Sequence, residues 1–343
     1  MKITTVGIDL AKAVLQVHGV NGYGKVVVRR QLKRKDVLRY FANLPPCLIG
    51  MEACGSAHDW ARKLMGFGHE VKLMAPQFVK PYVKTNKHDA ADAEAICEAV
   101  SRPNMRFVPI KTAENQAVLS VHRARSGFVK ARTAQANQIR GLLAEFGIVI
   151  PQGIAQIGKH MAALLEDGEN GLPGLMRQLL ERLHEHLKDL DRQVNELEAQ
   201  IQAWHRDNES SRRLAEIPGI GPITASALVA SIGDGKSFAN GRQLSAWLGL
   251  PPRQHSSGGK ATLLGMSKRG DVYLRTLLIH GARSVIRHVE NQEGDGWLKR
   301  LLGRRNKNIA AVALANKNAR MVWALLVHDR KFRPDYTAAT PVM

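Results

Sequence analysis

The order of apolar and polar positions predicts short strands at the start of the chain. Residues 5–9 form an apolar run, and an alternating run begins at Val14. The pair Asn21-Gly22 separates this run from a β-branched one over residues 26–28. Asn-Gly between two strand-like runs is a strong hairpin signal. We therefore predict three antiparallel strands.

Beyond this meander, helix and strand patterns alternate. An apolar residue every three or four positions indicates a helix, and a short continuous apolar run indicates a buried strand. The predicted elements are a helix over residues 36–42, a strand over 47–51, a helix over 57–65, a strand over 71–74 and a helix over 89–100. This order predicts an α/β sheet whose strands run in mixed directions.

A strict heptad pattern occupies the middle of the chain. From Met176 to Trp204, apolar residues are spaced 4, 3, 4, 3, 4, 3, 4, 3. We call these nine residues the heptad seam. Such a 3.5-residue period favours a coiled coil with a second helix, from the same chain or from another copy. The alternative is a long amphipathic helix packed within its own chain.

A basic helix precedes the seam. Residues 111–140 have a helical pattern that ends near Gly147 and Pro151, and Glu114 is the only acid in the segment. Charges of a single sign have no i,i+4 partners, so this face either contacts phosphates or is simply solvated. The basic residues expected to point outward are Arg123, Arg125, Lys130, Arg132 and Arg140.

The C-terminal part is mostly helical. Residues 217–222, IPGIGP, precede a helical run and are similar to the hairpin of a helix-hairpin-helix element. There Gly219 and Gly221 would let backbone N–H groups approach a DNA phosphate, although a Pro-Gly hairpin is often only a turn. A further helix is predicted over residues 241–248.

A serine-containing segment follows. Residues 249–259, GLPPRQHSSGG, are rich in Pro, Ser and Gly and predict an irregular loop. The loop holds Ser256 and Ser257, and serines in such loops usually form turns. The basic residues able to hold phosphates around them are Arg253, Lys268, Arg269 and Arg275.

Charge changes this picture by indicating a polyanionic partner. The 343 residues carry 50 Lys+Arg and 30 Asp+Glu, a net charge of +20. Residues 1–105 contribute +7 (16 basic, 9 acidic), 106–205 contribute +1 (12 and 11) and 206–343 contribute +12 (22 and 10). An excess of this size favours nucleic acid over small neutral substrates. An aromatic content of 5% disfavours a base-stacking platform.

Length, composition and cysteine content also indicate the domain organisation and the cellular compartment. We predict domains at residues 1–105, 106–210 and 211–330, followed by a tail at 331–343. Cys47, Cys54 and Cys97 lack metal-ligand spacing and are expected to be buried thiols. No apolar stretch is long enough for a membrane span, and no signal peptide is apparent. We expect a cytoplasmic protein.

Four acids are expected to converge on the sheet. Two predicted strands end on a carboxylate, at Asp9 and Glu52, and ligands bind at the carboxyl ends of strands in open α/β sheets. Asp89 and Asp92 each lie one turn before an apolar residue of the helix over 89–100, so both should face the sheet. Individually, Asp89 could be a helix cap and Asp9 a turn residue.

Several buried carboxylates require a cation, because burial and mutual repulsion are costly. Mg²⁺ is the expected ion, since it prefers carboxylate oxygens and leaves positions for substrate phosphates. Two ions about 3.5 to 4 Å apart would clamp the attacking and leaving oxygens of a phosphodiester displacement.

In their order along the chain, these motifs resemble those of the DEDD insertion-sequence transposases, which are described as bridge-RNA-guided DNA recombinases. The resemblance covers nearly the whole chain. It rests on GIDLAK with Asp9, GMEACG with Glu52, NKHDAADAEAI with Asp89 and Asp92, IPGIGPITASAL, SFANGRQLSAWLGLPPRQHSSGGK and MSKRGDVYLR.

The resemblance implies a RuvC-like (RNase H superfamily) domain whose four acids bind Mg²⁺, and a C-terminal transposase domain with a nucleophilic serine. In the motif Arg-x-x-x-Ser-Gly, Arg253 leads to Ser257 and Gly258, with Ser256 as an adjacent second hydroxyl. The family's serine attacks a DNA phosphodiester to form a covalent phosphoserine link.

The resemblance also implies the partners. A noncoding guide RNA would select donor and target double-stranded DNA. Two chains would combine one chain's acids with the other's serine, in a dimer or a tetramer of two dimers, near the nucleoid of a prokaryotic cell. Two alternatives stay open: a metal-dependent junction nuclease that uses water, and a non-enzymatic dimeric nucleic-acid-binding protein.

Overall fold

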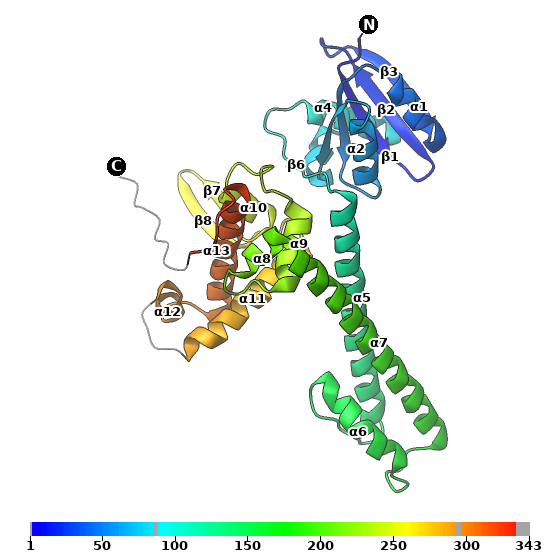
Figure 1. Cartoon of the computed structure of the whole chain (residues 1–343), viewed down its shortest axis with the longest axis vertical. Coiled ribbons are helices and arrows are strands. Elements are labelled where there is room, and N and C mark those ends of the chain that lie inside the picture. Colours follow the sequence, from blue (N-terminus) through cyan, green and yellow to red (C-terminus); the bar gives the residue numbers. More distant parts are fainter. Residues whose placement is uncertain (1, 85–87, 292–295, 334–343) are drawn as a thin grey trace. The chain divides into compact units, whose positions relative to one another are not determined.

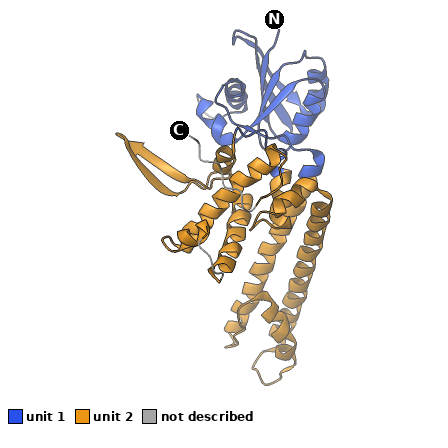
Figure 2. Ribbon diagram, turned by 60° about the vertical axis from the view of Figure 1, so that its left-hand side comes forward, with its two compact units in different colours: residues 1–116, 231–239 blue, residues 117–230, 240–343 orange. Residues whose placement is uncertain are grey.

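The computed structural model describes residues 2–84, 88–291 and 296–333 (Figure 1). The chain forms two compact units, coloured separately in Figure 2. One unit contains Met1–Gln116 and Ser231–Ala239, and the other contains Ala117–Ala230 and Asn240–Met343. The first is built on a β-sheet and the second is mostly helical.

A six-stranded mixed sheet forms the centre of the first unit, in the order β3-β2-β1-β4-β5-β6. The first three strands are antiparallel, β4 and β5 run parallel to β1, and β6 is antiparallel to β5. The strands are β1 (Thr5–Leu10), β2 (Val14–Val20), β3 (Val26–Lys33), β4 (Leu48–Glu52), β5 (Glu70–Met74) and β6 (Phe107–Val108).

One face of this sheet packs on α1 (Val37–Ala42) and α2 (Ala57–Met65). Ile8 and Met51 of the strands share a buried core with Phe41 of α1 and Leu64 of α2. Alternate strand residues point to opposite faces. The neighbours of Ile8 and Met51 therefore face the other side of the sheet.

That other side is covered by α4 (Asp89–Val100) at very close range. A Cβ at Gly7 would lie 2.2 Å from the Ala93 carbonyl oxygen, and one at Gly50 would lie 2.7 Å from Val100 Cβ. Only glycine permits this approach of helix to sheet. The short helices η1 (Arg34–Asp36), α3 (Pro76–Val79) and η2 (Lys80–Tyr82) complete this part of the unit.

Two long helices, α5 (Ala113–Ala144) and α7 (Gly174–Asp207), lie side by side and antiparallel (Figure 1). Ion pairs join Arg125 to Glu198 and Arg132 to Asp191, so residue numbers rise along one helix as they fall along the other. α6 (Ile154–Glu166) packs at the end of the pair. We refer to α5, α6 and α7 as the helical arm.

The heptad seam packs on α5 of the same chain. Met176, Leu180 and Leu187 share a core with Ile139 and Leu143. All nine seam residues are buried or half-buried. Packing against a helix of the same chain therefore explains the regular spacing of these apolar residues.

The rest of the second unit is a helical bundle with one hairpin. Its helices are α8 (Glu209–Ala215), α9 (Pro222–Ile232), α10 (Gly241–Trp247), α11 (Val272–Glu290), α12 (Trp297–Leu302) and α13 (Lys307–Val327). The hairpin consists of β7 (Pro252–Ser257) and β8 (Lys260–Met266). No helix in the described part of the chain is long and apolar enough to cross a membrane.

The elements predicted from the sequence in the first hundred residues are confirmed, as is the mixed direction of the sheet. The pattern missed α6 and β6. The expectation of an irregular loop over residues 249–259 is wrong, because residues 252–257 pair with 260–266. Of its three glycines, Gly258 and Gly259 form the two-residue turn of this hairpin, and Gly249 precedes the first strand.

Candidate active site

Asp9 and Glu52 lie next to each other at the ends of adjacent parallel strands. Ile8 of β1 is in register with Met51 of β4, so the following residues are the two acids. Both are half-buried. Each lies two positions after a glycine that contacts α4, so both side chains lie on the face that α4 covers. The sequence prediction of paired acids at this sheet edge is thus supported by the register.

The other two acids lie on α4, which crosses the same face of the sheet. The Cys97 thiol lies 3.7 Å from the Thr5 carbonyl oxygen, and both Ala93 and Cys97 lie against Gly7. From the β3 side to the β4 side, Glu94 pairs with Arg29, Ala93 and Cys97 lie against Gly7, and Val100 lies against Gly50, so α4 crosses the strands. Asp89 and Asp92 occupy the first turn of α4.

The two acids of α4 differ in exposure. Asp92 is half-buried, but Asp89 is exposed, so the expectation that both face the sheet is wrong for Asp89. The helix cap is His88, whose Nδ1 accepts a hydrogen bond from the Ala91 amide at 3.2 Å. Asp89 is therefore not needed as the cap.

The donor chemistry of these acids fits a hard divalent cation, which prefers carboxylate oxygens. Among the described residues, no three His, Cys, Asp or Glu side chains are placed closely enough to hold an ion together. Asp9 and Glu52 supply one adjacent pair. Asp92 and Asp89 are the further carboxylates, in the first turn of α4.

The pKa of the Cys54 thiol is affected by the negative charge of this site. Its pKa is raised, first by partial burial and then by the charges of Glu52 and Asp9. The thiol is accessible, so the expectation of three buried cysteines is wrong here, while Cys47 and Cys97 are buried. Cys54 is therefore close enough to both acids for their charges to raise its pKa.

Arg34 joins the loops that follow β1 and β4. Its Nη1 donates to the carbonyl oxygens of Ala11 and Lys12 at 3.2 and 3.4 Å, and its Nη2 donates to Ser56 Oγ at 3.1 Å. The guanidinium also lies over the Trp60 ring, 5.4 Å from its centroid. These contacts fix the backbone next to both acids. Sequence analysis did not identify Arg34.

An open pocket of about 450 Å³ lies beside this arginine. Its lining combines both loops with two cationic side chains. The lining residues are Leu10, Ala11, Lys12, Arg34, Cys54, Gly55 and Ser56. Acids at the strand ends next to a cationic pocket form a suitable environment for a phosphodiester, whose charge the cations balance.

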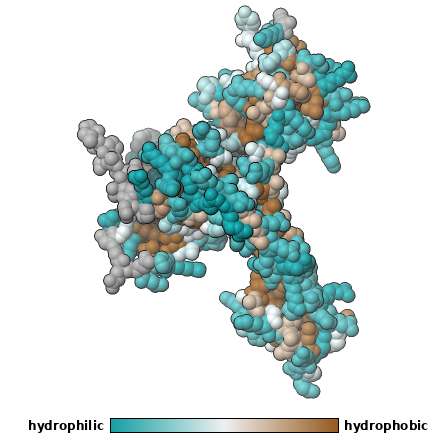
Figure 3. Space-filling view, viewed as in Figure 1, coloured by the Kyte–Doolittle hydropathy of each residue, from teal (hydrophilic) through white to brown (hydrophobic). Residues whose placement is uncertain are grey.

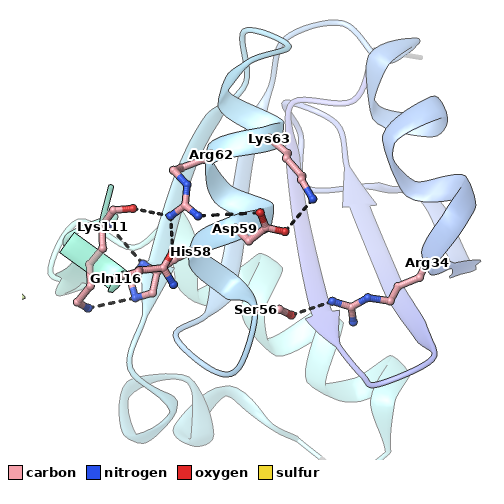
Figure 4. A network of polar contacts seen from close by, with 8 residues as sticks. All are labelled: Arg34, Ser56, His58, Asp59, Arg62, Lys63, Lys111 and Gln116. Carbon is pink, nitrogen blue, oxygen red and sulfur yellow. Dashed lines mark hydrogen bonds and ion pairs between the residues drawn. The ribbon is translucent and has the colours of Figure 1, made fainter. Parts of the chain in front are cut away.

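A polar network on α2 holds the start of α5 (Figure 4). Arg62 Nη1 donates to the Lys111 carbonyl oxygen at 2.6 Å and to Gln116 Oε1 at 2.5 Å. The Lys111 amide donates to His58 Nδ1 at 3.3 Å. The same helix that packs against the sheet therefore fixes the segment by which the chain leaves it.

Ser257 is the last residue of β7 and borders the turn of the hairpin. It pairs with Lys260 across Gly258 and Gly259, whose φ angles of 55° and 76° suit a type I′ turn. His255 lies two residues before it on the same face of the strand. All residues of β7 are exposed. The hairpin thus presents the serine at its tip.

The two adjacent serines differ in their contacts. Ser256 Oγ accepts a hydrogen bond from Gln254 Nε2 at 2.7 Å, on the opposite face from Ser257. Among the described residues, no hydrogen bond engages the Ser257 hydroxyl. Ser257 is therefore the more available of the two.

Several basic residues expected to contact nucleic acid have partners within the chain. Arg125 and Arg132 face α7 rather than solvent, in the ion pairs given above. Arg140 donates to the carbonyl oxygens of Pro151 and Gly153 at 3.2 and 2.7 Å. α7 supplies the acids that the basic helix lacks, so these side chains stabilise the arm.

The same holds for Arg275, which is 7% exposed and donates to the Leu248 carbonyl oxygen at 3.1 Å. Gly219 has a packing role, because a Cβ there would lie 2.9 Å from the Gly281 carbonyl oxygen of α11. Exposed residues remain as candidates for phosphate contact: Arg123, Lys130, Gly221, Arg253, Lys268 and Arg269.

A buried histidine that the sequence did not reveal connects three helices of the second unit. His122 is 1% exposed. Its Nδ1 lies 3.0 Å from the Tyr273 hydroxyl, and its Nε2 lies 3.1 Å from Ser226 Oγ. Burial, followed by the charge of Arg125, lowers the pKa of His122 to about 4. The imidazole is therefore neutral and structural.

Two family models match the chain, one over the region of the four acids and one over the region of the serine hairpin. Residues 6–148, which include all four acids, match the IS110 DEDD family model, described as Transposase. Residues 211–297, which include the serine hairpin, match the model described as Transposase IS116/IS110/IS902 family.

Full-length relatives are also similar. The chain is 55% identical to a probable family 20 transposase of Pseudomonas aeruginosa, over 97% of this chain and 100% of the relative. It is 46% identical to the transposase for insertion sequence element IS1111A of Coxiella burnetii, over 96% and 92%. It is 44% identical to the transposase for IS1328 of Yersinia enterocolitica, over 96% and 98%.

Proposed function

Because this chain belongs to the IS116/IS110/IS902 family of transposases, we propose that it moves an insertion sequence through a covalent phosphoserine intermediate. The observation that carries the proposal is the pairing of Asp9 and Glu52 at one sheet edge, together with an exposed serine at a hairpin tip. The first is suited to phosphoryl chemistry. The second is suited to reach a DNA strand.

The proposed first step is attack of Ser257 Oγ on a DNA phosphodiester. The Oγ–P bond forms as one P–O bond of the strand breaks, the serine proton leaves, and the released strand end takes up a proton. A hydroxyl of another strand then attacks the phosphoserine, which restores the serine and joins the new strand. Because the phosphoester bond is conserved, the exchange needs no ATP.

We assign the metal-binding role to Asp9, Glu52, Asp89 and Asp92, with Mg²⁺ as the ion. When bound, such an ion supplies positive charge to the phosphate oxygens and favours ionisation of the attacking hydroxyl. The chain's own residues hold the site: Arg34 fixes the two loops, and Lys12 adds a cationic side chain to the pocket.

The acids and the serine belong to different compact units, which suits an active site shared between two copies of the chain. A dimer is also supported by apolar side chains at the end of the helical arm, where Figure 3 shows apolar surface. We call them the arm-tip residues: Phe146, Val149, Leu175 and Leu179, which are 41%, 85%, 81% and 40% exposed. Two dimers would form the synaptic complex.

Guide RNA is the proposed selector of donor and target DNA. The net charge of +20 supports binding of several polyanionic strands at once. In guided systems, base pairing reads the sequence while the protein contacts the backbone. The helix-hairpin-helix-like turn, through Gly221, and the exposed basic residues of α5 are the proposed backbone contacts. Binding should weaken steeply with salt.

The nucleophile is tested by trapping the adduct. Protein, guide RNA and end-labelled donor and target DNA are combined, and the products are separated on a denaturing gel before and after protease treatment. Wild type and Ser256→Ala should form a protease-sensitive adduct, and Ser257→Ala should form none. Mass spectrometry should then locate the phosphoester on Ser257.

The same experiment distinguishes the hydrolytic alternative. A nuclease that uses water would cut the DNA without any adduct, and its cleavage would survive Ser257→Ala. Asp9→Ala and Asp92→Ala should abolish adduct formation but retain RNA binding. Equal loss of RNA binding would show that the acids are structural.

A further inference from the structure

A second pocket lies in the helical unit, between the first turn of α10 and the last turns of α13. It is open and has a volume of about 380 Å³. Arg320, Trp323 and Ala324 of α13 lie on one helix face, because they are spaced by three and four residues. The lining is completed by Asn240, Gly241 and Arg242. Nothing in the proposed strand exchange uses this pocket.

The base of the pocket is tightly packed. Gly241 is buried, and a Cβ there would lie 3.0 Å from both the Cα and the carbonyl oxygen of Arg320. Deeper along the same two helices, the Ser245 hydroxyl donates to Asn316 Oδ1. α10 and α13 are thus held in direct contact, so the pocket is preformed.

The pocket is cationic. Arg242 and Arg320 are exposed, and no acid lines the pocket. Within the part of the chain that the structure describes, neither arginine takes part in an ion pair. The sequences of α10 and α13 contain no Asp or Glu. An anionic ligand would therefore meet two arginines without competition from a neighbouring carboxylate.

Trp323 supplies an aromatic surface between these charges. The ring is half-buried, and its centroid lies 5.4 Å from that of His328 at an interplanar angle of 87°. The edge-to-face contact holds the indole on one side. Indole rings bind nucleobases by stacking, and this contribution does not depend on the base.

We propose that this pocket binds one unpaired nucleotide, with its base stacked on Trp323 and its flanking phosphates held by Arg242 and Arg320. A volume of this size suits a small ligand rather than a helix or a duplex. One aromatic side chain accommodates one base, which agrees with the low aromatic content of the chain. The unpaired nucleotide comes either from RNA or from a displaced DNA strand.

Binding of short unstructured oligonucleotides tests the proposal without any catalysis. Fluorescently labelled eight-nucleotide oligouridine, oligothymidine and a DNA duplex of equal length are titrated with the full chain at constant salt. Trp323→Leu should weaken single-strand binding about tenfold or more, whereas Trp323→Phe should retain most of it. Trp297→Ala is the matched control, because Trp297 is an exposed indole outside the pocket.

The arginines are tested by salt dependence. Arg242→Ala and Arg320→Ala should each lower the slope of log affinity against log salt by about 0.7 for single strands. Lys317→Ala should lower it less, since the Lys317 ammonium lies over the Trp297 ring, 5.0 Å from its centroid. Melting temperatures of all variants verify that each is folded.

A photo-crosslink provides a readout that needs no variant. An oligonucleotide carrying one 5-iodouridine, irradiated with the wild-type protein, should attach to Trp323, as mapped by mass spectrometry. Unchanged single-strand affinity in Trp323→Leu, an equal loss for duplex, or a crosslink elsewhere would overturn the proposal. The oligonucleotide that binds more tightly identifies RNA or DNA as the source.

Oligonucleotide binding tests the pocket, whereas adduct formation tests the serine, so the two proposals can be rejected independently. Ser257→Ala should bind the oligonucleotides as wild type does, because Ser257 lies outside the pocket. Loss of adduct formation with intact oligonucleotide binding therefore concerns only the serine.

Discussion

Arg34 donates a hydrogen bond to the Ser56 hydroxyl at 3.1 Å, and so connects the end of β3 to the loop after β4. Ser56 has a φ of 67°, in the left-handed region that non-glycine residues seldom adopt. The same guanidinium holds two carbonyl oxygens after β1. One side chain therefore fixes the backbone beside Asp9 and beside Glu52.

We expect Arg34→Ala to weaken the binding of the divalent ion that supports DNA cleavage. Residues that orient metal ligands through the backbone typically contribute 10- to 100-fold in affinity or activity. The ion concentration for half-maximal cleavage should therefore rise by about that factor. Lys35→Ala changes an exposed neighbouring cation and should have little effect. Equal ion requirements in both variants would contradict a positioning role for Arg34.

Alkylation of Cys54 should become faster when Mg²⁺ is added. The charges of Glu52 and Asp9 raise the pKa of this thiol, so an ion bound to those acids should lower it. At a pH below the pKa, each unit of decrease gives about a tenfold larger thiolate fraction. Iodoacetamide labelling, followed by peptide mass spectrometry, measures the rate.

Two comparisons control this experiment. Cys47 and Cys97 are buried with pKa values of about 11 and should stay unlabelled. Asp9→Asn should speed labelling without Mg²⁺ and remove most of the response to the ion. A rate that is insensitive to Mg²⁺ in the wild type would exclude ion binding next to Cys54.

The turn of the serine hairpin should require residues that tolerate positive φ. Gly259 has a φ of 76°, and a β-branched residue in this region costs about 1 to 2 kcal/mol. Gly259→Val should therefore disturb the position of Ser257 and reduce adduct formation. Gly259→Asn should retain more activity, since Asn adopts this conformation readily. Equal adduct yields in the two variants would show that the positive φ at position 259 does not control adduct formation.

Stability should depend on His122 in mildly acidic solution. Its pKa is lowered from 6.5 to about 4 in the folded chain, so the unfolded state binds the proton more tightly. The stabilising effect of the neutral ring is complete above pH 6.5 and is lost as the pH falls toward 4. The shift corresponds to about 3 kcal/mol.

Urea unfolding followed by circular dichroism between pH 4 and 7 measures this dependence. His122→Gln should be less stable at pH 7 but should lose less stability on acidification. A variant with the same pH dependence as wild type would assign the effect to other groups.

Association should depend on the arm-tip residues. Val149→Asp combined with Leu175→Asp places charge on two strongly exposed apolar positions. If the chain forms the proposed dimer through this surface, the double variant should be monomeric where wild type is dimeric, as measured by light scattering after gel filtration. Tyr23→Asp, at a side chain that is 97% exposed in the other unit, is the control. An unchanged mass would place the dimer contact elsewhere.

Much of the N-terminal fold could be predicted from local pattern. The Asn21-Gly22 hairpin, the buried strands and the helix from Asp89 to Val100 are encoded by neighbouring residues. The hairpin at Ser257 could not be predicted in this way, because its strands are exposed on both faces and have no apolar alternation. Its two turn glycines were recognised, but as a sign of irregularity.

Side-chain roles were harder to predict than the elements. The basic residues of α5 appear unpaired along their own helix, yet Glu198 and Asp191 of α7 neutralise two of them. His122, Arg34 and the pocket at Trp323 also depend on residues far apart in the sequence. Partners of this kind follow from packing, and one helix viewed alone does not reveal them.

Local sequence was enough to predict the periods of the helices and strands, the sign and distribution of charge, and the motifs that place the chain in its family. Local periodicity and composition depend only on neighbouring residues, so they can be recognised without knowledge of the fold. Only the fold shows that the heptad seam packs on the chain's own α5 and that Asp9 lies beside Glu52. It also shows which arginines already have acidic partners. These relationships arise only when strand register and helix packing bring distant residues within a few ångströms of each other.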